Sequence, residues 1–84
     1  MMTIKEAILK TLDDLKNKVN NSEIYEHIIR QDYYNFGDAK TPKSTISAQL
    51  GDFIRKNDSR VKRIKGKSGI FYYYLSKYED VIEF

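Results

Sequence analysis

Apolar residues recur at helical spacing near the start of the chain. Thr3, followed three residues later by Glu6, forms a capping box, a pattern that begins many helices. The apolar residues that follow fall on one helical face: Ile4, Ala7, Ile8, Leu12 and Leu15. A polar stretch over residues 17–21 ends the pattern. The sequence therefore predicts a first amphipathic helix with one buried face.

A second, shorter helix is predicted over residues 23–31, with Ser22 as its N-cap. Its apolar arc consists of Ile24, Tyr25, Ile28 and Ile29. His27 falls outside this arc, so we expect its side chain to be exposed. Residues 32–40 then combine Asn, Gly and Asp with three aromatic residues. This mixture predicts a loop that is held to the core by the rings of Tyr33, Tyr34 and Phe36.

The third predicted helix has the sharpest start signal. Thr41 can accept a backbone N–H as N-cap, and Pro42 at the first helical position loses no hydrogen bond and has a preset φ. We predict this helix over residues 42–56, with Asn57-Asp58 breaking it. Its apolar residues recur at i, i+4, i+7 and i+8 and should face the core: Ile46, Leu50, Phe53 and Ile54.

Two strand-like segments, residues 61–65 and 70–75, flank the sequence Gly-Lys-Ser-Gly at residues 66–69. They predict an antiparallel hairpin whose two glycines allow positive φ angles. One face of the second strand should carry Phe71, Tyr73 and Leu75. Tyr72 and Tyr74 point the other way, where they either stay exposed for stacking or partner contacts or cover that side of the hairpin.

Three helices followed by a β-hairpin is the element order of a winged helix-turn-helix, an α+β fold. In that fold the third helix enters a DNA groove and the hairpin is the wing. Val19, between the first two helices, could add a short third strand. The 84 residues suffice for one domain. We assign residues 1–78 to the winged helix-turn-helix domain and residues 79–84 to a C-terminal tail or a linker to a following domain.

Composition excludes several classes of protein. The chain has no cysteine, which excludes disulfides, zinc fingers and thiol catalysis. Its longest uncharged apolar run, residues 70–75, is far too short to span a bilayer. We therefore expect a cytoplasmic protein associated with the nucleoid.

Motifs associated with catalysis fail in their sequence context. Residues 66–68 match the end of a phosphate-binding loop, but Val61 occupies the position of its first glycine and a strand follows instead of a helix. Asp14-Leu15-Lys16 matches half of a nuclease metal site, but it lies in a helix without a second acid to share a metal. His27 is the only histidine. We expect no enzyme activity, no metal and no other cofactor.

The charge of the chain is strongly polarised. Residues 40–70 contain nine basic residues against only Asp52 and Asp58, a net charge of +7, whereas the whole chain carries +3. A basic element in an otherwise acidic domain is the electrostatic pattern of a surface that binds phosphates. We therefore expect double-stranded DNA as the partner.

The outer face of the third predicted helix is built from the small residues Ser44, Ala48 and Gly51, which would let its backbone approach a DNA groove closely. Alternatively, Ala48 and Gly51 pack against another helix or the loop. Asp52 on the same face counts against deep insertion. In the wing, the basic residues either contact phosphates or merely block strand addition at the hairpin edge. The candidate DNA contacts are Lys40, Lys43, Ser44, Thr45, Ser47, Arg55, Lys62, Arg63, Lys65, Lys67 and Ser68.

The chain resembles the HARE-HTH winged-helix family over about residues 3–75. The matching segments are Ile4-Lys5-Glu6-Ala7-Ile8, Ser22-Glu23-Ile24-Tyr25-Glu26-His27-Ile28, Thr41-Pro42-x-x-Thr45-Ile46-x-x-x-Leu50 and Phe71-x-Tyr73-x-Leu75. The Thr-Pro start of the third helix is the most specific of these. The resemblance implies a domain that binds DNA or links DNA-modifying enzymes to it.

A run similar to residues 41–55 occurs in bacterial restriction-associated proteins. This similarity implies a targeting domain of a restriction-modification or related DNA-processing protein, with a restriction or other DNA-processing enzyme domain as a further partner. Some members of the family are acidic and serve protein contacts. The alternative is therefore a protein–protein interaction module that docks through residues 33–36 or through the face of Tyr72 and Tyr74.

Overall fold

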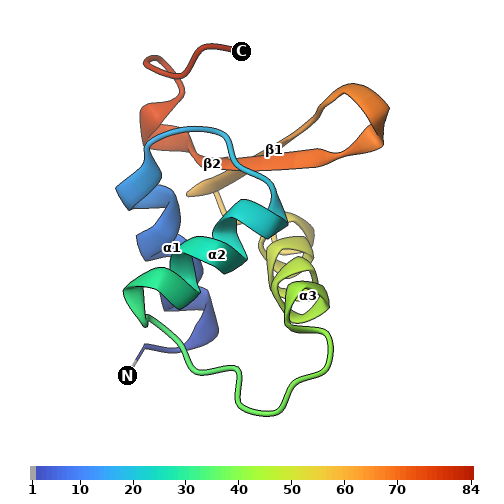
Figure 1. Ribbon diagram of the computed structural model, residues 1–84. Coiled ribbons are helices and arrows are strands. Elements are labelled where there is room, and N and C mark those ends of the chain that lie inside the picture. Colours follow the sequence, from blue (N-terminus) through green and yellow to red (C-terminus); the bar gives the residue numbers. More distant parts are fainter. Residues whose placement is uncertain (1) are drawn as a thin grey trace.

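The computed structural model describes residues 2–84. Three helices are followed by a two-stranded antiparallel hairpin, which confirms the predicted winged helix-turn-helix, an α+β fold (Figure 1). The elements are α1 (Ile4–Leu15), α2 (Asn21–Gln31), α3 (Pro42–Arg55), β1 (Val61–Lys65), the 3₁₀ turn η1 (Lys67–Gly69), β2 (Phe71–Leu75) and a second 3₁₀ turn η2 (Ser76–Tyr78). Within residues 2–84, no helix is long and apolar enough to cross a bilayer.

The helices enclose one apolar core, and the hairpin closes it. The buried apolar residues of the helices are Ala7, Ile8, Leu12, Ile24, Ile28, Ile46, Leu50 and Phe53, and those outside the helices are Val19, Val61, Tyr73 and Leu75. The predicted core faces of α1 and α3 are thus confirmed. The loop after α2 is held by its rings as predicted, because Tyr33, Tyr34 and Phe36 pack partly buried against the core. Since β1 contacts α3 and β2 contacts α1, the hairpin has a fixed position on the helices.

Both of the first two helices begin with a capping box. In α1, the predicted pair is confirmed: Thr3 Oγ1 accepts the N–H of Glu6 at 3.1 Å, and the Glu6 carboxylate accepts the N–H of Thr3 at 2.8 Å. In α2, the prediction was wrong, because the N-cap is Asn20 and not Ser22. Asn20 and Glu23 exchange the same two hydrogen bonds at 2.9 and 3.0 Å. In a capping box the acidic residue follows the N-cap by three positions. Glu23 follows Asn20 by three positions but comes directly after Ser22.

α3 begins at Pro42 as predicted, but the Thr41 side chain makes no capping hydrogen bond. The carbonyl of Thr41 instead accepts the N–H groups of Ser44 at 3.0 Å and Thr45 at 3.2 Å. Proline at the first position, with its preset φ, therefore carries the start signal. The helix ends at Arg55, and Asn57 adopts a φ of +53° just after it.

The hairpin register places Val61 opposite Leu75 and Lys65 opposite Phe71. Residues directly opposite in an antiparallel pair share a face, so one face of the hairpin runs from the core at Val61 to the exposed tip at Lys65. Val19 joins β2 through a single bridge to Tyr73, with two backbone hydrogen bonds of 3.0 and 2.8 Å. The possible third strand is therefore reduced to a one-residue bridge beside a two-stranded sheet.

The two glycines of the hairpin turn have different roles. Gly69 adopts a φ of +76° as predicted, but Gly66 has a φ of −86°, and the other positive φ in the turn belongs to Ser68 at +66°. Gly66 is needed for space instead, because a Cβ at this position would lie 2.5 Å from the ring of Tyr72.

The buried face of α2 is rotated from the prediction. His27 is buried and Ile29 is exposed, the reverse of what the apolar arc predicted. Ile24, His27 and Ile28 are spaced i, i+3 and i+4 and form the inner face. His27 is accommodated there because its Nε2 lies 3.0 Å from the carboxylate of Asp14 on α1. A polar partner on another helix thus makes a histidine suitable for the interface.

Residues after η2 pack against the outer face of the hairpin. The Tyr74 hydroxyl donates to the Glu79 carboxylate at 3.0 Å, and the Phe84 ring lies 5.2 Å from the Tyr74 ring. Tyr74 is consequently only 4% exposed, so it covers this side of the hairpin and is not a free contact surface. Ile82 is also buried. The domain boundary at residue 78 stays a prediction.

Candidate nucleic-acid interface

All eleven candidate contact residues are exposed. They form two patches. The helix patch, on or beside α3, consists of Lys40, Lys43, Ser44, Thr45, Ser47 and Arg55. The wing patch consists of Lys62, Arg63, Lys65, Lys67 and Ser68. In Figure 1 the hairpin reaches past the helices on the side of the molecule where α3 lies.

The small-residue face of α3 is free of packing. Ser44 and Ala48 are exposed, and a Cβ on Gly51 would meet only the Nη1 atom of Arg55, at 3.2 Å. The alternative interpretation, that Ala48 and Gly51 pack against another helix or the loop, was therefore wrong. An exposed helix face without large side chains lets a partner come close to the backbone.

The acid of this face, Asp52, is surrounded by bases. Lys5 of α1 donates to its carboxylate, and Lys56 and Arg55 lie at 3.2 Å from it. The hydrogen bonds from Lys5 and then Lys56 lower the pKa of Asp52 to about 2. Its side chain is only 23% exposed. Because its charge is compensated within the domain, Asp52 opposes a polyanion far less than its position in the sequence predicts.

The second acid of the basic segment, Asp58, is also occupied. Its two oxygens accept hydrogen bonds from the guanidinium of Arg60 at 3.0 and 2.7 Å. These bonds lower the pKa of Asp58 to about 2. Both acids between residues 40 and 70 are thus held in internal ion pairs.

Five bases of the two patches have no carboxylate partner within residues 2–84: Lys40, Lys43, Arg63, Lys65 and Lys67. Lys62 differs, because it pairs with Glu79 at 3.1 Å and lowers the pKa of that carboxyl. The uncompensated charge therefore lies at the start of α3 and along the outer half of the hairpin.

The outer half of the hairpin also carries exposed apolar side chains. Ile70 is 47% exposed and Phe71 is 40% exposed. The guanidinium carbon of Arg63 lies 4.2 Å from the centroid of the Phe71 ring. We predicted that Phe71 shares one face of β2 with Tyr73 and Leu75. The Phe71 ring is exposed, whereas Tyr73 and Leu75 are buried, so Phe71 lies beyond the end of the core.

One contact of the helix patch was not expected from the sequence. Asn21, the first residue of α2, donates its Nδ2 hydrogen to Ser47 Oγ at 2.6 Å. Ser47 keeps its hydroxyl hydrogen and one lone pair for a ligand, and Asn21 becomes a further polar group beside α3. No sequence signal marks this pair, because the two residues are on different helices.

The rings that the alternative docking surface would use are mostly engaged within the domain. The Tyr33 hydroxyl donates to Asp14. The Phe36 ring packs against Tyr25 in a tilted arrangement and against Tyr34 edge to face, at centroid distances of 5.4 and 5.0 Å. This aromatic cluster fixes the loop before α3. It also leaves less free apolar surface for a protein partner than the sequence predicts.

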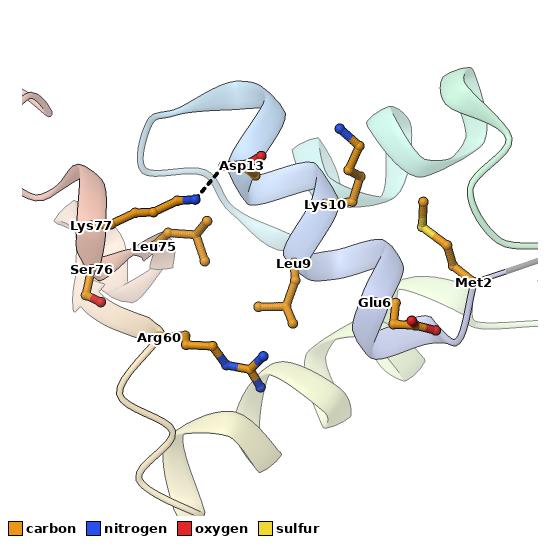
Figure 2. Close-up of a pocket in the computed structure, with 9 residues that line it drawn as sticks. All are labelled: Met2, Glu6, Leu9, Lys10, Asp13, Arg60, Leu75, Ser76 and Lys77. Carbon is orange, nitrogen blue, oxygen red and sulfur yellow. Dashed lines mark ion pairs between the residues drawn. The ribbon is translucent and has the colours of Figure 1, made fainter.

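Two features bear on possible metal and small-molecule sites. Residues 2–84 contain no group of three or more acidic or histidine side chains placed to hold a metal ion. A cavity of about 470 Å³ lies between α1 and the end of β2, with Leu9 and Leu75 lining its apolar part (Figure 2). Two charged side chains at this cavity pair with each other, Lys77 with Asp13 at 3.1 Å.

Comparisons with protein-family models, with curated proteins and with solved structures found no match. The candidate interface therefore rests on the residues of this chain.

Proposed function

We propose that this chain is a non-catalytic DNA-binding domain whose α3 and wing contact the duplex. The observation that carries the proposal is the distribution of charge. Five bases of the two patches are unpaired within residues 2–84, whereas Asp52 and Asp58 are held by internal ion pairs. A surface with this one-sided charge attracts a polyanion and releases its counterions on binding.

The shape of α3 supports a groove contact. Its outer face has only small side chains, at Ser44, Ala48 and Gly51, so a DNA groove can come close to the helix backbone. Lys43 and Thr45 lie beside this face. In this proposal α3 enters the major groove while the wing cations lie along the backbone. The longest dimension of the domain is 36 Å. One turn of B-DNA is about 34 Å long, so one copy covers about one turn and we expect modest affinity.

We further propose that the domain belongs to the HARE-HTH family and targets a bacterial restriction-modification or related DNA-processing protein to DNA in the cytoplasm. The support is the segment beginning at Thr41-Pro42, in which Ile46 and Leu50 are buried and the intervening residues are exposed or half-buried. The contacts of a DNA-processing enzyme domain would then use surface outside the two patches.

The test is a fluorescence-anisotropy titration with a short labelled duplex at two salt concentrations, using plain and cytosine-methylated versions. The affinity of the wild-type chain should fall steeply with salt. Lys65→Glu with Lys67→Glu should weaken binding and reduce the slope of log K against log salt by about 2. The matched control is Lys16→Glu with Arg30→Glu, which reverses two exposed charges outside the patches and should leave the slope nearly unchanged.

The proposal fails if the wild-type chain binds neither duplex at low salt. Equal losses in the two double variants would also oppose it, because they would indicate a response to net charge alone. Binding to a protein partner that is insensitive to salt would then favour the alternative, a protein–protein interaction module.

A further inference from the structure

The tip of the wing combines two features that a simple phosphate contact does not need. Ile70 and Phe71 expose large apolar surface at the hairpin end, although burying them would stabilise a small domain. Cations surround them: Lys65 is directly opposite Phe71, and Lys67 lies in the turn. A surface that needed only to attract phosphates would place polar residues at these positions.

Phe71 and Arg63 form a stacked pair. The hairpin register makes Arg63 the diagonal neighbour of Phe71 on the same face, a spacing that long and aromatic side chains can bridge. The guanidinium lies over the ring at 4.2 Å, and no carboxylate within residues 2–84 competes for it. A planar cation on a ring holds both groups in a defined orientation.

We propose that the Arg63–Phe71 pair is a stacking platform for an unpaired nucleobase in DNA that the domain binds. This inference rests on the proposed function, since α3 and the wing cations would hold the duplex beside the platform. Aromatic rings and guanidinium planes stack on bases of any sequence. In regular B-form DNA the faces of the bases are covered by their neighbours, so the platform selects DNA in which a base is already unpaired.

Charge identifies a nucleic acid as the occupant rather than an apolar partner protein. Arg63, Lys65 and Lys67 lie at the platform without a compensating acid in the described residues, and an apolar docking segment would leave these charges unsatisfied. A flat apolar surface within a ring of cations matches a base attached to its phosphates.

The experiment compares two labelled duplexes with identical lengths and equal numbers of phosphates. In one, a central adenine pairs with thymine; in the other, the same adenine lies opposite an abasic site and is therefore unpaired. The wild-type chain should bind the second duplex about tenfold more tightly, within the range of stacking on one aromatic group. Phe71→Ala and Phe71→Leu should abolish this preference, whereas Phe71→Trp should keep it.

Lys65→Ala is the matched control, because it removes a phosphate contact without changing the ring. It should weaken binding to both duplexes by the same factor. Equal wild-type affinity for the two duplexes would overturn the inference and leave the proposed function standing. The inference would also be overturned, and the proposed function would stand, if Phe71→Ala weakened binding to the two duplexes equally. The ring would then contact the wall of a groove and not an unpaired base. Absence of binding to either duplex at low salt would overturn the proposed function, and the platform with it.

Discussion

Nε2 of His27 on α2 lies 3.0 Å from Oδ2 of Asp14 on α1. A carboxylate can only accept, so Nε2 carries the hydrogen of this bond. The same carboxylate accepts from Lys10 at 2.9 Å and from the Tyr33 hydroxyl. Asp14 thus joins α1, α2 and the loop that leads to α3.

Replacing Asp14 by asparagine should destabilise the domain by about 1.5–3 kcal/mol, the range for hydrogen bonds to charged groups. The asparagine amide has one uncharged acceptor oxygen and replaces the other oxygen by an NH2 donor, so the bonds to Lys10, His27 and Tyr33 would be fewer and weaker. The buried imidazole is sensitive to this change, because its Nδ1 has no partner. Urea unfolding followed by circular dichroism measures the change. Asp38→Asn, at an exposed loop position, is the control and should stay within about 0.5 kcal/mol of wild type.

Acid should weaken the fold through the same group. Partial burial raises the pKa of Asp14, but hydrogen bonds from Lys10, Tyr33 and His27 outweigh this effect and leave the pKa below its ordinary value of 3.8. A carboxyl group whose pKa is lower in the folded than in the unfolded chain stabilises the fold at pH values above its pKa in the unfolded chain. This stabilisation is lost as the pH falls toward its pKa in the folded chain. Asp52 and Asp58, with pKa values of about 2, act in the same direction.

The urea concentration at the unfolding midpoint of the wild-type chain should therefore decrease as the pH is lowered from about 5 to about 2. Asp14→Asn should show a shallower fall, because one of the titrating carboxylates is gone. Identical pH profiles for the two proteins would mean that Asp14 does not contribute to acid unfolding.

Gly66→Ala should damage the wing more than the helical core. The new Cβ would lie 2.5 Å from the Tyr72 ring, so the ring or the turn must move. We expect loss of DNA affinity with a smaller change in the helical circular dichroism signal. Gly37→Ala is a useful comparison, because it places a side chain at a positive φ of +59° in open space and strains the loop without touching the wing. Unchanged affinity in Gly66→Ala would show that the turn geometry is unimportant for binding.

Gly51→Ala separates stability from DNA contact. Alanine favours a helix interior over glycine by about 1 kcal/mol, and the added methyl group meets only the flexible end of Arg55. The melting temperature should therefore rise. DNA affinity should fall, because the methyl group adds bulk to the face of α3 that we propose to enter the groove. If affinity is unchanged in the stabilised variant, this face of α3 does not approach DNA closely.

Much of the fold was predictable because its signals are local. The Thr3–Glu6 capping box and the proline at the start of α3 each act within a few residues, and the structure confirms both. The strand at residues 71–75 was also predicted, but its burial does not alternate, because Tyr74 is buried together with Tyr73 and Leu75. The choice of Ser22 over Asn20 as the N-cap of α2 was an error in applying the same local rule, because the required spacing to Glu23 is present in the sequence.

The exposed polar residues of the candidate site were also predictable. The apolar spacing of α3 identifies its inner face, and the remaining positions of the helix follow from it, so Lys43, Ser44 and Thr45 were correctly expected on the outside. The burial of His27 and Tyr74 was not predictable in this way. Each is covered by a partner distant in sequence or outside its own element, Asp14 for the first and Glu79 with Phe84 for the second.

The sequence by itself determined the order of the elements, the inner faces of α1 and α3 and the concentration of positive charge in residues 40–70. These depend on periodicity and composition, which the chain carries residue by residue. Only the tertiary structure decided which charges remain free and which rings remain exposed. Lys5 reaches Asp52 from another helix, and Arg63 meets Phe71 across two strands. Such pairings depend on how the elements pack in space, so no local pattern encodes them.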